Sequence, residues 1–287
     1  MQTKQSAHQG IRIDDLRDVR MSVVWLNGDF VDQSEARVPV ADRGFTLADG
    51  IFETIKAVGP RPFWLSEHFE RLKAGAVKIG LTIPFSEHRI SDAIDRLLAG
   101  ATVDTPSAIR LTVTRGSAAR GLWPKDAASQ PTCVLTAAPS PATHPQDFVV
   151  CRSTRRNQHS PLSRIKSLGY GDNILARREA IERDVDDAIM LNTEGHVACA
   201  TVGNVFFRID GAWITPPEAD GILPGLARNR FLKELGAVEA SISADMIRKP
   251  DAGFVCNSLG FSQIKSLDGR GLPGDLTAVP IQAVYSP

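Results

Sequence analysis

The segment SPLSRIKSLGYGDNILARREA, residues 160–180, contains a lysine whose side chain could do covalent chemistry. Lys166 carries a primary amine, the only side-chain group that forms a reversible imine with an aldehyde. A lysine between polar residues is usually a surface lysine, so this residue alone does not define a site. An aldehyde held by Lys166 would also need groups that bind the rest of its molecule, and the chain offers several.

Three other segments provide groups that bind anions. In GILPGLAR, Pro and Gly precede an expected helix, so the free amides of Leu226 and Ala227 can point at an anion, where the helix dipole adds attraction. In HFERL, Arg71 has a guanidinium that can bind a phosphate through two parallel hydrogen bonds. In CNSL, Ser258 contributes a hydroxyl. A phosphate is the kind of anion that such a guanidinium and such helix amides can bind.

These segments resemble the fold-type IV pyridoxal-phosphate enzymes, a family of branched-chain and D-amino-acid aminotransferases and 4-amino-4-deoxychorismate lyase. The ordered motifs are DRG–DG–FE, HxxRL, TRG, IKSLxY, GxV…N, TPP and ILPG–AR, which cover most of the chain. The resemblance implies that Lys166 forms an aldimine with pyridoxal 5′-phosphate and that Tyr170 hydrogen-bonds the phenolic oxygen of this cofactor. It also implies a phosphate cradle of Arg71, Leu226, Ala227 and Ser258, although relatives usually have threonine where this chain has Ala227.

Cys199 is the main departure from the family pattern. In GHVACATVGNVFF the family frame is G-x-V-x-E with an asparagine five residues later, so Asn204 sets the register and puts Cys199 at the glutamate position. That glutamate normally keeps the pyridine nitrogen protonated, which makes the ring a strong sink for carbanion electrons. A thiol, whose ordinary pKa is about 8.5, does this poorly. We expect Cys199 to contact the cofactor, and it can also pack as a small buried apolar side chain.

Two arginines are expected to bind the substrate. D-amino-acid aminotransferases carry an Arg-x-His pair after a TRG segment, and this pair binds the substrate carboxylate. In TRGSAARGL, Arg120 matches the arginine, but Leu122 replaces the histidine. Arg43 is the second residue of the motif segment DRGFTLADGIFET, residues 42–54, which we expect to line the active site.

The resemblance leaves three functions open. The first is an aminotransferase that moves an amino group between a branched-chain or D-amino acid and a 2-keto acid. The second is a lyase of the aminodeoxychorismate type that eliminates pyruvate, which Cys199 favours and Glu53 disfavours, because FET is the aminotransferase form of its motif. The third is a pyridoxal-phosphate-binding protein with catalysis weakened by Cys199. No other catalytic signature, such as GxSxG, a P-loop or HExxH, is present in the sequence.

Composition argues against several other classes. The 287 residues contain 33 Lys plus Arg and 33 Asp plus Glu, so no net field favours nucleic acid or an acidic membrane. No apolar run approaches the ~20 residues that span a bilayer, and the first 20 residues lack a signal-peptide core. The four cysteines show no metal spacing. We therefore expect a cytoplasmic enzyme without a metal site, and the resemblance implies a homodimer whose partner chain closes the active site.

Periodicity and turn signals predict an α+β fold with two domains. Ser66 and Ser86 are expected to cap two helices. Strands or hairpins are expected at 23–32, 108–116, 131–139, 147–154, 188–201 and 205–215, and helices at 66–80, 86–100, 172–183 and after Pro224. The predicted divisions are a polar extension at 1–20, a domain at 21–137, a proline-rich linker at 138–146 and a second domain at 147–287. The resemblance implies that the first is a small N-terminal α/β domain and that the second is a larger cofactor-binding domain with a β-barrel-like core.

Overall fold

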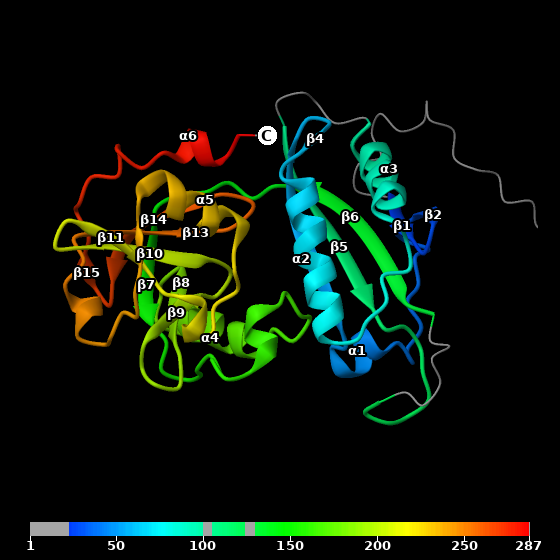
Figure 1. The fold of residues 1–287 in the computed structure, drawn as a ribbon, viewed down its shortest axis with the longest axis horizontal. Helices are drawn as coiled ribbons and strands as arrows, with labels where there is room; N and C mark the ends of the chain where they lie inside the picture. Colours follow the sequence, from blue (N-terminus) through cyan, green and yellow to red (C-terminus); the bar gives the residue numbers. More distant parts are fainter. Residues whose placement is uncertain (1–22, 100–104, 124–129, 287) are drawn as a thin grey trace, which may run out of the picture.

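The computed structural model describes residues 23–99, 105–123 and 130–286, and the predicted extension at 1–20 lies outside them. The chain forms two lobes, each built on its own β-sheet (Figure 1). Helices and strands alternate without a regular βαβ repeat, so the predicted α+β class with two domains is confirmed. The exact boundaries of the predicted domains stay predictions.

The N-terminal lobe contains a six-stranded antiparallel sheet in the order β2-β1-β6-β5-β3-β4. Its strands are rich in β-branched residues, as the sequence predicted. They are β1 (Val23–Leu26), β2 (Asp29–Asp32), β3 (Gly50–Val58), β4 (Arg61–Pro62), β5 (Pro106–Thr114) and β6 (Thr132–Pro139). A short helix, α1 (Arg43–Leu47), precedes β3.

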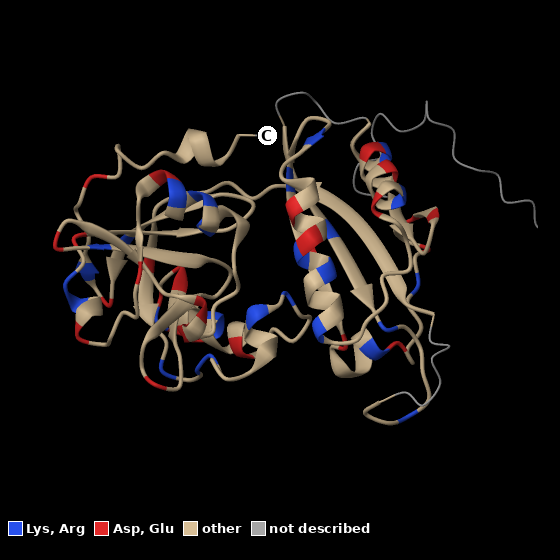
Figure 2. Cartoon of the chain, in the orientation of Figure 1, with Lys and Arg blue, Asp and Glu red and all other residues tan. Residues whose placement is uncertain are grey.

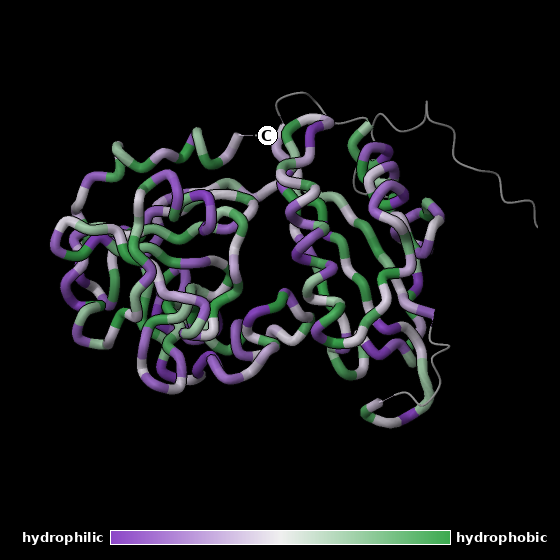
Figure 3. Tube along the Cα trace, in the orientation of Figure 1, coloured by the Kyte–Doolittle hydropathy of each residue, from purple (hydrophilic) through white to green (hydrophobic). Residues whose placement is uncertain are grey.

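Two helices cover this sheet, α2 (Leu65–Lys78) and α3 (Glu87–Leu98). Phe69 and Leu72 of α2 and Ile90 and Ile94 of α3 are buried against the sheet. Both helices alternate apolar and polar positions along their length (Figure 3). Ser86 caps α3 by accepting a hydrogen bond from the amide of Arg89, as predicted.

The predicted cap at Ser66 is wrong. Helix α2 begins one residue earlier, and its N-cap is Trp64, which has a left-handed backbone conformation and makes no side-chain capping bond. Its ring stacks on Tyr285 at a centroid distance of 5.6 Å, and its indole N–H donates to the carbonyl of Ser286. A contact with the far end of the chain therefore determines where this helix begins.

The C-terminal lobe contains a nine-stranded mixed sheet in the order β12-β11-β10-β13-β14-β7-β8-β9, with β15 paired to β14. Strands β9 and β10 stand near opposite ends of this order but are joined by only three residues, so the sheet must curl toward a barrel. The strands are β7 (Gln146–Val150), β8 (Asp187–Leu191), β9 (Val197–Ala200), β10 (Asn204–Ile209), β11 (Ala212–Thr215), β12 (Val238–Glu239), β13 (Ala252–Cys256), β14 (Phe261–Leu267) and β15 (Arg270–Gly271).

Three helices pack around the curled sheet: α4 (Gly171–Glu182), α5 (Leu226–Leu235) and α6 (Ile281–Val284). The inside of the curl holds Phe148, Ile189 and Phe207, which are fully buried. Its outer face packs against α5 and α6 through an aromatic cluster that includes Phe206 and Phe231. The predicted β-barrel-like core is therefore confirmed as a partly closed sheet.

Basic and acidic side chains are interspersed over both lobes (Figure 2). Opposite charges commonly pair on the surface, as Lys73 does with Glu70 and Glu87. None of the helices in the described ranges is long and apolar enough to cross a membrane.

Candidate active site

A pocket of about 890 Å³ lies between the two lobes. Residues of β3, α2 and β5 line one side, and the 156–174 segment, the β9–β10 turn and the start of α5 line the other. Most of the predicted site residues meet there: Arg71, Lys166, Tyr170, Cys199, Leu226 and Ser258.

Backbone hydrogen bonds to β3 position Lys166. The amide of Phe52 donates to the carbonyl of Lys166 over 2.9 Å. The amide of Leu168 donates to the carbonyl of Gly50 over 3.0 Å. A Cβ atom at Gly50 would lie 2.6 Å from the carbonyl oxygen of Val113 and 2.8 Å from Leu168 Cδ1. The glycine of the DG motif therefore allows the lysine segment to approach the strand closely.

The Lys166 amine lies in an aromatic corner of the pocket. Its Nζ is 3.3 Å from the Tyr170 hydroxyl and 4.3 Å from the centroid of the Phe52 ring. Burial lowers the pKa of Lys166 to about 8, although the negative charge of Glu53 opposes this shift. An appreciable fraction of the amine is therefore neutral near neutral pH, and this is the form that attacks an aldehyde.

The start of α5 forms the anion-binding end of the pocket. The amides of Leu226 and Ala227 have no hydrogen-bond partner within the described residues, as expected of the first turn of a helix. The side chain of Ala227 is buried beneath the helix, so only its amide is left for an anion. Asn204 Nδ2 donates to the carbonyl of Leu223 over 2.9 Å and so holds the preceding loop.

Gly225, the N-cap of α5, leaves room for this arrangement. A Cβ atom there would lie 2.0 Å from Asn204 Oδ1. We expect Gly225→Ala to displace the Asn204 amide and weaken binding of pyridoxal phosphate by roughly 10- to 100-fold, since a mispositioned first turn loses its charge-assisted hydrogen bonds. An absorbance titration of the apo protein with cofactor measures this loss.

Gly171→Ala is the matched control. Gly171 begins α4 beside the same pocket, and a Cβ atom there would meet nothing within 4 Å. We expect this variant to bind the cofactor like the wild type. Equal affinities for the two alanine variants would contradict the role given to Gly225.

Arg71 reaches the same end of the pocket from α2 and is held by Glu53. Arg71 Nε donates to Glu53 Oε1 over 2.8 Å, and Nη2 donates to Oε2 over 2.6 Å. His68 Nδ1 lies 2.7 Å from the same Oε2. Burial opposes ionisation of Glu53, but Arg71 and His68 outweigh it and lower the pKa of Glu53 to about 2.

This pairing leaves part of the Arg71 guanidinium available. A guanidinium has five N–H donors, and Glu53 takes the two on its Nε side. Nη1 donates to the carbonyl of Pro224 over 3.3 Å, just before α5. The remaining donors can meet a phosphate at the helix start. The sequence placed Glu53 only in a strand that lines the site, and its ion pair became visible only in the structure.

Neither predicted substrate arginine is among the described residues that line the pocket of its own chain, so their role in substrate binding stays a prediction. Arg43 is buried, and its donors bond to Asp49 and to the carbonyls of Gly121 and Leu122. Its motif thus fixes the loop after β5. Arg120 is exposed on that loop, away from the pocket-lining residues.

Arg110 is the pocket arginine that sequence reasoning missed. Its guanidinium stacks on the Phe52 ring at 3.8 Å and makes no hydrogen bond within the described residues. It faces the Lys166 corner, where its charge helps to lower the pKa of Lys166. The alternation of β5 could have indicated which face Arg110 occupies, but not that this face borders the cofactor site.

Cys199 lies on the pocket wall in β9, opposite Met190 of β8. Burial raises the pKa of its thiol, while the positive charge of Arg156 acts in the opposite direction. The thiol is therefore neutral near pH 7.

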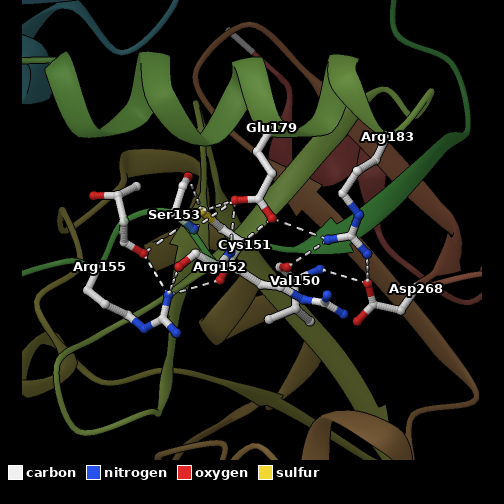
Figure 4. Close-up of polar contacts among 9 residues, drawn as sticks. Val150, Cys151, Arg152, Ser153, Arg155, Glu179, Arg183 and Asp268 are labelled. Carbon is white, nitrogen blue, oxygen red and sulfur yellow. Dashed lines mark hydrogen bonds and ion pairs between the residues drawn. The ribbon is translucent and has the colours of Figure 1, made fainter.

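The loop that carries Arg156 is anchored by Glu179 of α4 (Figure 4). The Glu179 carboxylate accepts hydrogen bonds from the backbone amides of Arg152 and Ser153 at 2.8–3.0 Å. Burial opposes its ionisation, but these amide hydrogen bonds outweigh burial and lower the pKa of Glu179 to about 2. Helix α4 thereby holds the loop that leads from β7 into the pocket.

We expect Glu179→Gln to destabilise the protein by about 2 kcal/mol, because an amide replaces one carboxylate oxygen and loses the charge-assisted bonds. A carboxylate with a lowered pKa stabilises the fold above its unfolded pKa of ~4.5 and loses this effect as pH falls toward 2. The variant should therefore lose less stability than the wild type between about pH 5 and 3. Urea unfolding at several pH values measures both effects.

Glu182→Gln is the control for this prediction. Glu182 lies on the same helix and is mostly exposed, and it pairs only with Arg178. We expect a change within ~0.5 kcal/mol and an unaltered pH dependence. A Glu179 variant that behaved in the same way would rule out the anchoring role.

The pocket fits pyridoxal phosphate. It joins an amine with a lowered pKa to helix amides that have no partner within the described residues, and Gly225 lets Asn204 pack close against the start of that helix. Arg71 adds the cation that a phosphate requires, and Tyr170 supplies a hydroxyl beside the amine. The fold and this set of groups define a pyridoxal-phosphate enzyme of fold type IV.

Comparisons with known proteins agree with this class. The family model for class IV amino-transferases matches residues 50–267. The chain is 34% identical to a putative branched-chain-amino-acid aminotransferase of Methanocaldococcus jannaschii, over 86% of this chain and 88% of that protein. It therefore belongs to the class IV aminotransferase family, and pyridoxal phosphate is its cofactor.

Other relatives differ in the reaction that they are named for. An aminodeoxychorismate lyase of Bacillus subtilis is 27% identical and covers 92% of this chain and 93% of its own length. A D-alanine aminotransferase of Staphylococcus haemolyticus is 31% identical, with coverages of 91% and 94%. The structure of a branched-chain aminotransferase from Thermoproteus uzoniensis with norvaline superposes with a TM-score of 0.81 at 29% identity, covering 91% of each chain.

Proposed function

We propose that this protein is an aminotransferase that moves an amino group between an amino acid and a 2-keto acid. The observation that carries this proposal is the placement of Arg110. The Arg110 guanidinium lines the same pocket as the Lys166 amine and has no hydrogen-bond or ion-pair partner within the described residues. It is separate from Arg71 and the start of α5, the groups that would hold the cofactor phosphate. A substrate carboxylate can pair with Arg110 while its amino or keto carbon lies near Lys166.

Each side chain has a distinct task in this reaction. Bound pyridoxal phosphate supplies an electron-withdrawing ring that stabilises negative charge at the substrate α-carbon. Lys166 Nζ, with its pKa lowered to about 8, can accept and return a proton at that carbon. The Tyr170 hydroxyl, 3.3 Å away, orients this amine. Arg71 and the first turn of α5 hold the phosphate and so keep the ring in register with Lys166.

We expect Arg110→Gln to raise KM for the amino donor and the keto acid by roughly 10- to 100-fold with a smaller change in kcat, because a charge-assisted carboxylate contact is lost. Arg96→Gln is the control, since Arg96 also stacks on an aromatic ring, that of Phe30, but does not line the pocket. Steady-state kinetics with both substrates measures the effect. Unchanged KM values in the Arg110 variant would show that the carboxylate binds elsewhere.

The reaction is tested by adding L- and D-amino acids to the purified protein without a keto acid. Conversion of the visible band of the pyridoxal form to the near-ultraviolet band of the pyridoxamine form is the expected result. Addition of a 2-keto acid should restore the first band. The amino acids that respond would define chirality and side-chain class, and a visible band that persists with every amino acid would exclude an aminotransferase.

A lyase reaction is the second candidate. Cys199 favours it, because a thiol in place of the family glutamate weakens protonation of the ring, and a neutral ring is compatible with elimination as well as with amino transfer by a less delocalised path. The relative from Bacillus subtilis is named as such a lyase. Release of pyruvate from aminodeoxychorismate without any amino acceptor would support this reaction and separate it from amino transfer.

We also propose that the protein forms a homodimer and works in the cytoplasm. Four exposed apolar side chains, Val40, Phe45, Leu122 and Trp123, lie on α1, on the loop before it and on the loop that carries Arg120. A second copy that covers them would bring its Arg120 loop to the neighbouring pocket. Light scattering tests the dimer, and Phe45→Asp should favour the monomer. The four buried free cysteines fit a reducing compartment.

A further inference from the structure

The groups that line the pocket, together with the sequence register, indicate which wall would face the ring nitrogen of the cofactor. In pyridoxal phosphate, the nitrogen lies directly across the ring from the carbon that bears the aldehyde, and the phosphate and phenolic oxygen lie to either side. Lys166, the α5 cradle and Tyr170 mark those three directions. Cys199 of β9 lines the same pocket close enough to act on the charge of Tyr170, and its sequence register matches the family residue that contacts the ring nitrogen.

No carboxylate stands ready to protonate the ring nitrogen. Of the described residues that line the pocket, Asp172 is the only acidic one. It is exposed at the start of α4, and its carboxylate accepts a hydrogen bond from Thr154 over 2.8 Å. Asp187 lies near Cys199 but does not line the pocket, and Arg177 pairs with it at 2.9 Å. Glu53 pairs with Arg71 at the phosphate end.

Arg156 supplies a cation instead. Its Nη2 donates to the carbonyls of Ser163 and Gly221 at 2.9 and 3.3 Å, which holds the guanidinium against the pocket wall. Its Nη1 has no hydrogen-bond partner within the described residues. The backbone of Arg156 pairs with the end of β8, next to β9, and its charge acts on both Tyr170 and Cys199.

We infer that this chain keeps the pyridine nitrogen of its cofactor unprotonated, with the Arg156 guanidinium and the neutral Cys199 thiol in place of a carboxylate. The inference rests on the proposed function, because it assumes that the pocket holds pyridoxal phosphate. A cation disfavours a second positive charge nearby, and a neutral thiol provides no compensating negative charge. Apart from the exposed Asp172, the other charged side chains among the described lining residues are Arg71, Arg110 and Lys166, which are basic.

The protonation state has a chemical consequence. A neutral ring withdraws fewer electrons from the substrate α-carbon than a protonated ring does. Removal and return of the proton at that carbon therefore depend more strongly on Lys166 and Tyr170. Side reactions that need a highly delocalised carbanion become slower. The residues that face the ring nitrogen would thus restrict the range of reactions that the shared fold performs.

The test is nitrogen NMR of the intact protein carrying pyridoxal phosphate labelled with ¹⁵N in the ring. The ring-nitrogen chemical shift distinguishes the protonated from the unprotonated form without any turnover. We expect the unprotonated shift in the wild type from about pH 6 to 9, and the same in Cys199→Ala. Cys199→Glu should give the protonated shift. Arg156→Gln should raise the midpoint of protonation by about one pH unit, because a nearby cation is removed.

Two outcomes would overturn the inference. One is a protonated ring nitrogen in the wild type at neutral pH. The other is an unchanged midpoint in Arg156→Gln, which remains informative even if the Glu variant does not fold. Borohydride reduction followed by mass spectrometry shows independently whether the cofactor is attached to Lys166. A protein that carried no cofactor would contradict the proposed function. A protonated ring nitrogen in a protein that carries the cofactor would contradict only the inference about ring protonation.

Discussion

Lys166→Ala abolishes covalent attachment of the cofactor and lowers amino transfer by at least ~1,000-fold, because one amine serves as both the attachment point and the proton carrier. The buried amine also costs desolvation energy, as its pKa of about 8 shows. The apo form of the variant should therefore be at least as stable as the wild-type apo protein. Borohydride reduction and mass spectrometry measure attachment, and thermal unfolding measures stability.

Lys78→Ala is the control for this variant. Lys78 lies at the exposed end of α2 and does not line the pocket. It should retain full attachment and activity. A reduced cofactor adduct that persisted in Lys166→Ala would place the reactive amine on another residue.

The lowered pKa also predicts how attachment depends on pH. Only the neutral amine attacks the aldehyde, so the rate of attachment to the wild-type apo protein should rise about tenfold per unit below pH 8 and level off above it. Stopped-flow absorbance measures this profile. A rate that kept rising toward pH 10 would mean that Lys166 has the pKa of an exposed lysine.

Glu53→Gln has the second largest expected effect. It removes the charge that pairs with Arg71 and leaves a mostly buried guanidinium with a neutral partner, which should lower stability by about 2–4 kcal/mol. Arg71 should also lose its fixed orientation, so we expect the affinity for pyridoxal phosphate to fall by roughly tenfold or more. Urea unfolding of the apo protein and a cofactor titration separate the two effects.

Glu67→Gln is the matched control, because Glu67 also pairs with an arginine, Arg230, but at the surface. Its loss should change stability by ~0–1 kcal/mol and leave cofactor affinity unaltered. If Glu53→Gln lost stability but bound the cofactor normally, its ion pair would stabilise the fold without orienting Arg71.

Much of the local structure could be predicted from sequence because its signals are local. The hairpins at Asn27-Gly28 and Asp210-Gly211 turn where the two-residue motifs indicated, with positive φ at all four positions. Ser86 caps its helix for the same reason. Ser66 does not, because a tertiary contact of Trp64 with Tyr285 governs the start of α2. Local rules failed where a distant part of the chain determines the conformation.

The candidate site also contains some residues that could be predicted from local motifs and others that could not. Lys166, Tyr170 and the start of α5 could be predicted because each belongs to a short motif that matches the family pattern in order along the chain. Arg110 and Arg156 carry no such motif. Their importance depends on which side chains from separate strands face one cavity, and sequence spacing does not contain that information.

The family, the cofactor and most of the groups expected to bind it could be predicted from the sequence, because ordered motifs preserve chemical groups along the chain. How those groups are charged and paired became known from the folded structure. The pKa of Lys166, the Glu53–Arg71 pair and the cation beside Cys199 all depend on burial and on distances between residues far apart in sequence. Electrostatic energies change steeply with both quantities, and neither exists until the chain has folded.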